Sequence, residues 1–444
     1  MKKIIILGAA YILALGGWAF AYKASVAVIP FENLSKVSEI EWIGSGIAET
    51  MTTDLKKVKD LKVIERAQLK KVMEELKIKL LTETDTKNAA EAGKLAGADQ
   101  VVIGGFQRSG TKLRITARLV DVNSTEVLKS FKVTGDYGNL FELQDQIVAK
   151  ILESFGIPME EKIKKEIEKA ETKSLKAYEH YIRGRDYYLF FSADNYELAL
   201  EEFKKALEID NGYALAWSGM SQVYSTWGYH KQQRGEDYKS MYEQSLKAGK
   251  KAVDLDPALG DTHRALAQSQ LMLEDFSKAA KEAQKAIDLN PNDAEAWEIL
   301  AHANPKGDPD WAIEKFNRAL ELNPKLFSAH NDLGEVYFEQ KNYEKAIENF
   351  REAIKLIPGS INAHNNLGLA YKNKGDLEKA VREFNAALEL DPDSVAVHFN
   401  LARTYQEQGA GQEALKEFQK VLELKPDHPQ AETIKEIIKL LSSE

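Results

Sequence analysis

The C-terminal part of the chain repeats with a fixed period. The segments SAHNDLG (328–334) and NAHNNLG (362–368) place His330 and His364 34 residues apart, and His398 follows at the same interval. A period of this length is typical of stacked two-helix units, which bury their apolar faces only against their neighbours. We therefore predict an all-α superhelical solenoid for this part of the chain.

The residue types within one unit indicate the kind of repeat. The unit 327–360 carries small, apolar and helix-ending residues at Leu333, Gly334, Tyr337, Ala346, Phe350, Ala353 and Pro358. Small residues let two helices approach closely, and proline ends the second helix because it lacks an N–H group. This pattern resembles the tetratricopeptide repeat (TPR). It recurs about seven times over residues 175–428, with an insertion around Tyr229–Lys239, and a helix within 429–444 is expected to cover the open end of the stack.

Histidine recurs at the fourth position of the first helix in these units, at His180, His263, His330, His364 and His398. Such a ladder is either a row of metal or haem ligands or part of the architecture. Equivalent residues of adjacent units lie about 10 Å apart or more, whereas the ligands of one ion lie within about 2 Å of it. Trp217 and Trp297 also occupy this position in other units. We therefore interpret the ladder as packing, and we expect no metal and no cofactor.

The concave surface of the solenoid is the predicted binding site for a partner. First-helix positions that face the inner curve are Asn331, Glu335, Phe338, Asn365, Leu369, Lys372, Phe399, Arg403 and Gln406. Amides beside aromatic and charged groups suit an extended peptide or a partner helix. The alternative is that these side chains form an ordinary solvated face.

An α/β domain is predicted over residues 24–157. Apolar runs, helical spacings and turns give the order βαβααβββα, which indicates a mixed sheet with helices packed on it. The segments VAVIPFENLS (26–35), KVIER (62–66) and AGKLAGADQVVIGGF (92–106) resemble the amino-terminal domain of TolB and the related domain of curli-secretion lipoproteins. The resemblance implies an envelope protein whose domain serves partner binding and assembly rather than catalysis.

Two glycines, Gly44 and Gly46, precede a predicted helix in this domain. A GxG at a helix entry sometimes binds an anion. The motif lacks the remaining residues of a phosphate-binding loop, so the glycines are interpreted as a requirement of backbone geometry.

The N-terminus has the order of a secretory signal. Lys2 and Lys3 precede an apolar run to Trp18, and Ala19-Phe20-Ala21 follows. We expect residues 1–21 to be a signal peptide cleaved after Ala21, or an uncleaved inner-membrane anchor formed by residues 4–21. The protein is then exported, to the periplasm or beyond, and contacts a membrane only through this segment if it is retained.

A charged stretch connects the two parts. Residues 158–174 contain MEEKIKKEIEKAETK, whose Glu–Lys pairs one turn apart favour a solvated helix. We predict a helical linker that acts as a semi-rigid spacer between the domains. A coiled-coil dimer is the alternative, but the segment is shorter than three heptads.

Composition and the absence of certain motifs limit the classes of function that this protein can have. A net charge of −9 without a basic stripe argues against nucleic acid as a partner. The absence of cysteine excludes thiolate catalysis and Fe–S clusters, and HExxH, GxSxG, P-loop and EF-hand motifs are missing. We predict a non-catalytic adaptor or scaffold of the cell envelope that binds protein or peptide partners. The alternatives are a self-assembling, filament-forming protein and, less favoured, an enzyme or a histidine-based metal sensor.

Overall fold

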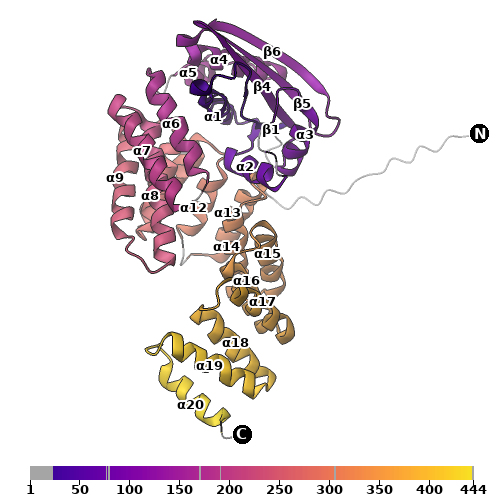
Figure 1. The fold of residues 1–444 in the computed structure, drawn as a ribbon, viewed down its shortest axis with the longest axis vertical. Coiled ribbons are helices and arrows are strands. Elements are labelled where there is room, and N and C mark those ends of the chain that lie inside the picture. Colours follow the sequence, from indigo (N-terminus) through magenta and orange to yellow (C-terminus); the bar gives the residue numbers. More distant parts are fainter. Residues whose placement is uncertain are drawn as a thin grey trace, which may run out of the picture.

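The computed structural model describes residues 24–442, except residues 77, 79, 80, 170, 171, 191, 305 and 306. It consists of an N-terminal α/β domain followed by a long array of helices (Figure 1). The predicted signal peptide lies outside the described residues. Within them, no helix is both long and apolar enough to cross a bilayer.

The α/β domain is built on one mixed sheet, as the sequence predicts. Its strands are β1 (Ala24–Val28), β2 (Glu32–Asn33), β3 (Leu61–Val63), β4 (Gln100–Ser109), β5 (Lys112–Asp121) and β6 (Val127–Asp136). The strand order is β3-β1-β4-β5-β6, and the short strand β2, which was not predicted, also pairs with β4. β1 runs parallel to β3 and β4, and β4, β5 and β6 form an antiparallel meander.

Helices cover both faces of this sheet. Its helices are α1 (Trp42–Lys56), α2 (Arg66–Glu75), α3 (Thr86–Leu95) and α4 (Leu140–Ser154), with 3-10 turns at Ser38–Ile40 and Tyr137–Asn139. Because side chains alternate along a strand, Val26 and Val28 of β1 enter one core with α1 and α4. Ala27 and Ile29 enter a second core with α2 and α3 on the opposite face.

The two glycines at the start of α1 are explained by close approach. A Cβ atom on Gly44 would lie 2.1 Å from the backbone oxygen of Phe31, so no larger residue fits without moving the chain. A Cβ on Gly46 would lie 3.1 Å from the Tyr178 hydroxyl, which belongs to the first repeat helix. These contacts agree with the interpretation of the glycines as a geometric requirement.

The connector differs from the predicted spacer. Within its described residues the connector forms one helix, α5 (Glu161–Ile167), which is shorter than the charged stretch. Ile167 is buried in the core of the α/β domain, and Lys57 of that domain donates a hydrogen bond to the carbonyl of Glu166 at 2.8 Å. The connector therefore packs on the α/β domain. The expectation that it holds two domains apart is wrong, because the apolar face of the helix, though sparse, is large enough to be buried.

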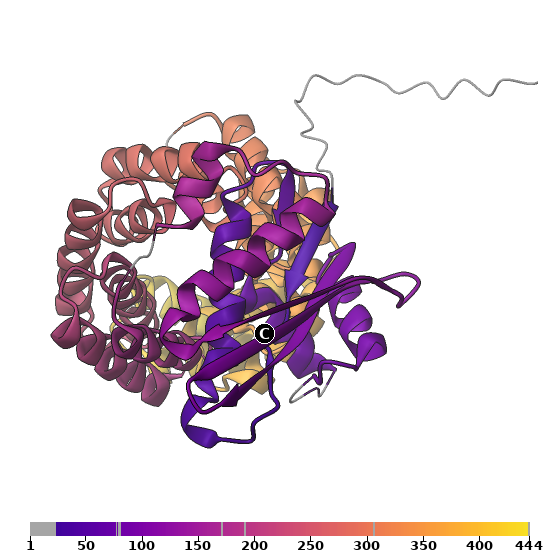
Figure 2. The same ribbon diagram turned by 90° about the horizontal axis from the view of Figure 1, so that it is seen from above.

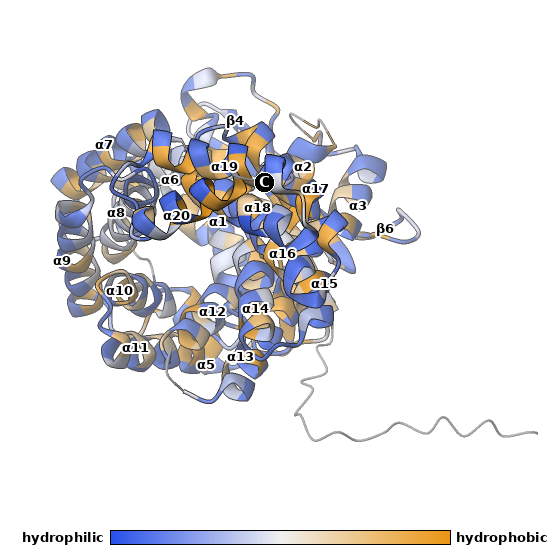
Figure 3. Cartoon of the chain, turned by 90° about the horizontal axis from the view of Figure 1, so that it is seen from below, coloured by the Kyte–Doolittle hydropathy of each residue, from blue (hydrophilic) through white to orange (hydrophobic). Residues whose placement is uncertain are grey.

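The helical array runs from α6 to α20. Its helices are α6 (Leu175–Tyr188), α7 (Ala193–Ile209), α8 (Ala214–Gln233), α9 (Lys239–Leu255), α10 (Gly260–Met272), α11 (Phe276–Leu289), α12 (Ala294–His302), α13 (Pro309–Leu322), α14 (Phe327–Glu339), α15 (Tyr343–Leu356), α16 (Ile361–Lys374), α17 (Leu377–Leu390), α18 (Val395–Gln408), α19 (Gly411–Leu424) and α20 (Ala431–Leu441). Consecutive helices from α6 to α19 pack in pairs, and α20 packs on α19. The array curves through an arc (Figure 3).

The repeat signature has a direct packing reason. A Cβ atom on Gly334 or Gly368 would lie 2.6 Å from the ring of Phe350 or Phe384, respectively. Each glycine thus lets the phenylalanine of the second helix press against the backbone of the first. Phe384 is fully buried.

The histidine ladder is part of the same architecture. In His263, His330, His364 and His398, Nε2 lies 2.9–3.2 Å from the carbonyl oxygen of the proline six residues earlier. Trp297 donates its indole N–H to the carbonyl of Pro291 at 2.9 Å in the same way, and Trp217 donates to Asn211 at 3.1 Å. The shared position therefore requires a flat ring with an N–H group that binds the end of the preceding unit.

Candidate functional site on the inner surface of the repeats

The α/β domain lies against the inner surface of the first repeats. It sits at the open side of the arc of repeat helices (Figure 2). Tyr178, Tyr181 and Arg185 of α6 stand at the second, fifth and ninth positions of their repeat, counted from the histidine register. The fifth and ninth are among the positions predicted to bind a partner in the later repeats. In the first repeat they face the protein's own α/β domain.

Tyr178 is the central contact between the two parts. Its hydroxyl donates to the carbonyl of Gly46 at 2.6 Å and lies 2.6 Å from the hydroxyl of Thr50. Gln144 of α4 donates a third hydrogen bond to it at 3.2 Å. The rings of Trp42 and Phe141 pack edge-on against the Tyr178 ring. One hydrophobic core therefore extends from the sheet into α6, α7 and α8.

A buried ionic cluster lies beside this contact. The carboxylate of Glu49 on α1 pairs with Arg66 on α2 at 2.7 Å and with Arg185 on α6 at 3.0 Å. Arg66 also pairs with Asp186 of α6 at 3.0 Å. The side chains of Glu49 and Arg66 are only 11% and 9% exposed. The cluster thus joins three helices from both parts of the protein with the charges balanced.

Contacts continue to the fourth repeat. Asn292, before α12, donates its side-chain amide to the carbonyl of Leu61 in β3 at 2.6 Å. Lys62 donates to the carbonyl of Glu321 in α13 at 2.7 Å, and Lys325 pairs with Glu75 of α2 at 3.2 Å. The α/β domain therefore spans the inner surface from α6 to the loop before α14.

Docking of the α/β domain is expected to weaken in acid. Burial alone would raise the pKa of Glu49, but Arg185 and Arg66 outweigh it and lower this pKa from 4.5 to about 2. A carboxylate whose pKa is lower in the folded than in the unfolded state stabilises the fold at pH values above its unfolded-state pKa. This stabilisation is lost as the pH falls to the folded-state pKa. We expect a contribution of about 3 kcal/mol that is complete above pH 4.5 and lost between about pH 4.5 and 2.

Urea unfolding at a series of pH values measures this contribution. Other carboxylates also titrate in this range, so the comparison is with Glu49→Gln, which cannot ionise. The difference in unfolding free energy between the two proteins should shrink steadily as the pH falls. A difference that stays constant from pH 6 to pH 2.5 would contradict the assignment.

Beyond the α/β domain, α14, α16 and α18 carry the predicted binding residues on the part of the array that extends away from it (Figure 1). Asn331 donates to Glu335 at 2.9 Å, and Asn366 donates to the same Glu335 oxygen at 2.7 Å. Asn400 donates to the side-chain oxygen of Asn365 at 2.9 Å. Side-chain amides of adjacent repeats therefore hold one another in place. Asn366 and Asn400 are adjacent in sequence to Asn365 and Phe399 but are not among the predicted binding residues.

The remaining predicted binding residues differ in their partners and in their exposure to solvent. Lys372 pairs with Glu407 of α18 at 3.0 Å, and Arg403 donates to Gln406 at 3.3 Å. Arg403 and Gln406 are exposed, whereas Leu369 is half-buried.

The two aromatic residues are partly covered by their own repeats. Phe338 packs edge-on against Tyr343, and Phe399 stacks on His428 and packs against Phe418. Phe399 therefore belongs partly to the core that α20 closes.

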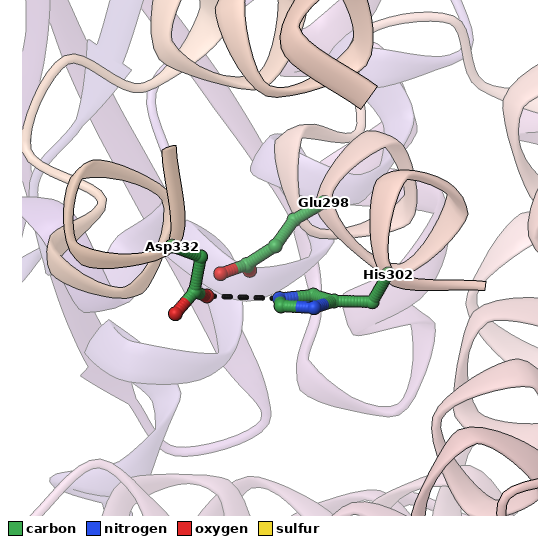
Figure 4. A group of neighbouring side chains, drawn as sticks. All are labelled: Glu298, His302 and Asp332. Carbon is green, nitrogen blue, oxygen red and sulfur yellow. Dashed lines mark hydrogen bonds and ion pairs between the residues drawn. The ribbon is translucent and has the colours of Figure 1, made fainter. Parts of the chain in front are cut away.

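A group of polar residues that the sequence analysis missed lies where the covered and open parts of the inner surface meet. Glu298 and His302 come from α12 and Asp332 comes from α14, and their side chains converge (Figure 4). His302 Nε2 lies 2.8 Å from a carboxylate oxygen of Asp332. Burial raises the pKa of Glu298 to about 7. Burial alone would lower the pKa of His302, but the hydrogen bond and charge of Asp332 raise it to about 9.

The repeat register contains the signal for this group. Counted from Trp297 at the fourth position, Glu298 is at the fifth position and His302 at the ninth. In the next repeat the same two positions are Asn331 and Glu335, which were predicted to bind a partner. Extending the same choice to this shorter repeat would have found both residues.

Comparisons with known proteins agree with this architecture. Models described as TPR or tetratricopeptide repeat match residues 264–304, 306–341, 334–375 and 374–438. A model described as the curli production assembly/transport component CsgG matches residues 19–112. The fold and these matches define a protein with a mixed α/β domain followed by a TPR solenoid. More particularly, its N-terminal domain is CsgG-like.

Several curated proteins are similar over part of their length. A protein described as putative adenylate cyclase 3, from Rhizobium meliloti (strain 1021), is 26% identical over 245 residues, 55% of this chain and 40% of the relative. The mitochondrial import receptor subunit TOM70 of Homo sapiens is 26% identical over 155 residues, 34% of this chain and 25% of the relative. Anaphase-promoting complex subunit 3 of Schizosaccharomyces pombe is 30% identical over 106 residues, 24% of this chain and 16% of the relative. The chain therefore spans less than half of the length of these relatives.

Solved TPR structures are also similar to parts of the array. YrrB, described as a TPR protein with an unusual peptide-binding site, has a TM-score of 0.38 at 22% identity and covers 43% of this chain and 99% of its own. MamA from Desulfovibrio magneticus RS-1 has a TM-score of 0.36 at 26% identity, covering 38% of this chain and 97% of its own.

Proposed function

We propose that this protein is a non-catalytic adaptor whose TPR array binds a protein partner on the inner surface of its later repeats. One observation carries this proposal. In the first repeats the fifth and ninth positions bind the α/β domain through Tyr181, Arg185 and their neighbours. In the last repeats the ninth position carries Glu335 and Arg403, which are exposed.

The open surface has the chemistry to hold a protein segment. The side-chain oxygen of Asn365 accepts a hydrogen bond from Asn400, which leaves its amide N–H groups as donors without a recorded partner in the described part of the chain. Such donors suit the backbone carbonyls of an extended segment. The charges change along the surface from Glu335 to Arg403, so a partner segment would have a preferred direction.

We also propose that the adaptor acts in the cell envelope. The N-terminal residues have the order of a secretory signal, and the CsgG model that matches residues 19–112 describes a curli assembly and transport component. A TolB-like role of the α/β domain in partner binding belongs to the same proposal. In this arrangement the docked α/β domain and the open repeats place two binding surfaces on one chain, which raises the effective concentration of their partners.

Site-specific photocrosslinking in cells tests the adaptor function. A photoreactive amino acid replaces Arg403, an exposed residue of the inner surface on α18, or Arg382, an exposed residue of α17. We expect crosslinks to a different protein from position 403 and few from position 382. Cell fractionation of the same samples should find the crosslinked protein with the envelope.

The outcomes separate the alternatives. Equal crosslinking from both positions, or none from position 403, would contradict the assignment of the inner surface. Crosslinks from position 403 to a second copy of the chain would instead favour the self-assembling protein. Recovery of the chain in the cytoplasmic fraction alone would contradict the envelope location.

A further inference from the structure

Three potential metal ligands converge between two helices of the inner surface. Glu298 and His302 are four residues apart on α12, so their side chains leave the same face of the helix. Asp332 reaches them from α14. The ligand atoms of the three residues all lie within 4.8 Å of one another (Figure 4). A pair of ligands four residues apart on one helix is the spacing by which helices present side chains to zinc.

The surrounding structure holds these groups in place. The His302 ring packs edge-on against Phe316 of α13, with ring centroids 5.1 Å apart, which restricts its rotation. Asn331 donates to both Asp332 and Glu335, so the neighbouring carboxylates are also oriented. His302 and Asp332 keep side-chain exposures of 36% and 21%, which gives an ion a route from solvent. Restrained ligands with solvent access favour metal binding because little order has to be created.

The charges around the group are not balanced by basic side chains. Glu298, Asp332 and Glu335 lie close together, yet none of them forms an ion pair with lysine or arginine within the described residues. Among the described residues, His302 is the single basic side chain that pairs with one of these carboxylates. A divalent cation would compensate the remaining negative charge.

We propose that Glu298, His302 and Asp332 bind one divalent first-row metal ion, with Zn²⁺ as the representative ion. One imidazole and two carboxylates match the nitrogen and oxygen ligands of zinc, at bond lengths of about 2.0–2.2 Å. Imidazole favours zinc and its neighbours over Mg²⁺ and Ca²⁺. Binding replaces the hydrogen bond between His302 and Asp332, since the ion takes the place of the shared proton. Three protein ligands leave a further position for water or for a group from a partner.

The ladder histidines do not offer the same site. His364 has Nδ1 at 2.8 Å from Glu383 and Nε2 at 3.2 Å from the carbonyl of Pro358, so both ring nitrogens are used within its repeat. His302 has a carboxylate partner that is itself a ligand. The three proposed ligands also lie at the edge of the α/β domain, because Glu298 lines a cavity that Gln68 of that domain borders. The ion would therefore bridge α12 and α14 where the α/β domain ends and the open surface begins.

Zinc titration of the full, untagged protein tests the proposal. After treatment with a chelator and its removal, isothermal titration calorimetry with Zn²⁺ should give one strong site per chain, and elemental analysis after dialysis should give the same stoichiometry. Substitution of Co²⁺ should give visible absorption of the bound ion. His302→Gln should weaken zinc binding by more than the 10–100-fold that is typical for the loss of an outer-shell partner.

Two further variants make the result decisive. Glu298→Gln removes a second ligand with little change in shape, and it should also weaken binding even if His302→Gln fails to fold. His364→Gln removes an imidazole of the ladder and should leave the affinity unchanged. The absence of a one-to-one zinc site, unchanged affinity in the folded His302→Gln and Glu298→Gln proteins, or an equal loss in His364→Gln would each overturn the proposal.

Discussion

Replacing Glu49 with glutamine is expected to lower the free energy of unfolding by about 3–5 kcal/mol and to release the α/β domain from the first repeats. Glu49 is the shared partner of Arg66 and Arg185, whose side chains are 9% and 17% exposed. Without its charge, two buried guanidinium groups lose their main compensation. Removing one partner of a buried ion pair is costly because the remaining charge has little access to water.

Urea unfolding followed by circular dichroism measures the stability, and small-angle X-ray scattering measures the separation of the two parts. The matched control is Glu179→Gln on α6. Glu179 also lies between two basic residues, Lys176 at 3.0 Å and Arg183 at 2.8 Å, but these are 61% and 44% exposed. We expect the control to change stability by less than about 1 kcal/mol. Equal effects of the two substitutions would show that burial of the cluster does not stabilise docking.

Replacing Phe384 with alanine is expected to cost about 3–5 kcal/mol and to unfold the last repeats before the rest of the protein. The Phe384 ring is fully buried and fills the space left by Gly368 on the facing helix. Its removal leaves a cavity that the two rigid helices cannot close. Phe384 belongs to a core separate from the one that joins the α/β domain to the first repeats. Because repeats contact only their neighbours, the damage should stay local.

Hydrogen exchange measured by mass spectrometry distinguishes local from global unfolding. Peptides from α16 to α19 should lose protection in the variant, while peptides from α1, α4 and α6 should keep it. The control is Leu390→Ala at the end of the same helix, where the side chain is 45% exposed and a change within about 0.5 kcal/mol is expected. Loss of protection throughout the chain would mean that the two cores unfold as one unit.

Much of the fold was predictable because its signals are local. The repeat period and the small residues at fixed positions are explained by contacts within one helix pair, such as Phe350 on Gly334. The short, continuous apolar run that contains β1 predicts a buried strand, and every residue of β1 is buried. β2 was missed because two residues are too short to carry any periodic pattern.

The candidate site was predictable in part. The repeat register predicted which first-helix positions line the inner surface, but it was applied only to the three most regular repeats. It therefore missed Glu298 and His302 in a repeat whose shorter first helix hides the pattern. The regularity of the histidine ladder arises from a hydrogen bond to the end of the preceding unit, which His263, His330, His364 and His398 all make. His302 stands outside the ladder.

The sequence by itself determined the two architectures and the phase of the repeats, and from that phase it predicted which residues face the inner curve. Only the tertiary structure decided which part of that surface is covered. Tyr181 and Arg185 occupy the same repeat positions as Asn331 and Glu335, and nothing local distinguishes the two pairs. The difference comes from the α/β domain, more than a hundred residues away in the sequence, where Glu49 pairs with Arg185 and Gly46 accepts a hydrogen bond from the neighbouring Tyr178. Helix formation depends on neighbours along the chain. Which part of the inner surface is covered depends on complementary shape and charge between the α/β domain and the repeats, and these surfaces exist only after both parts have folded.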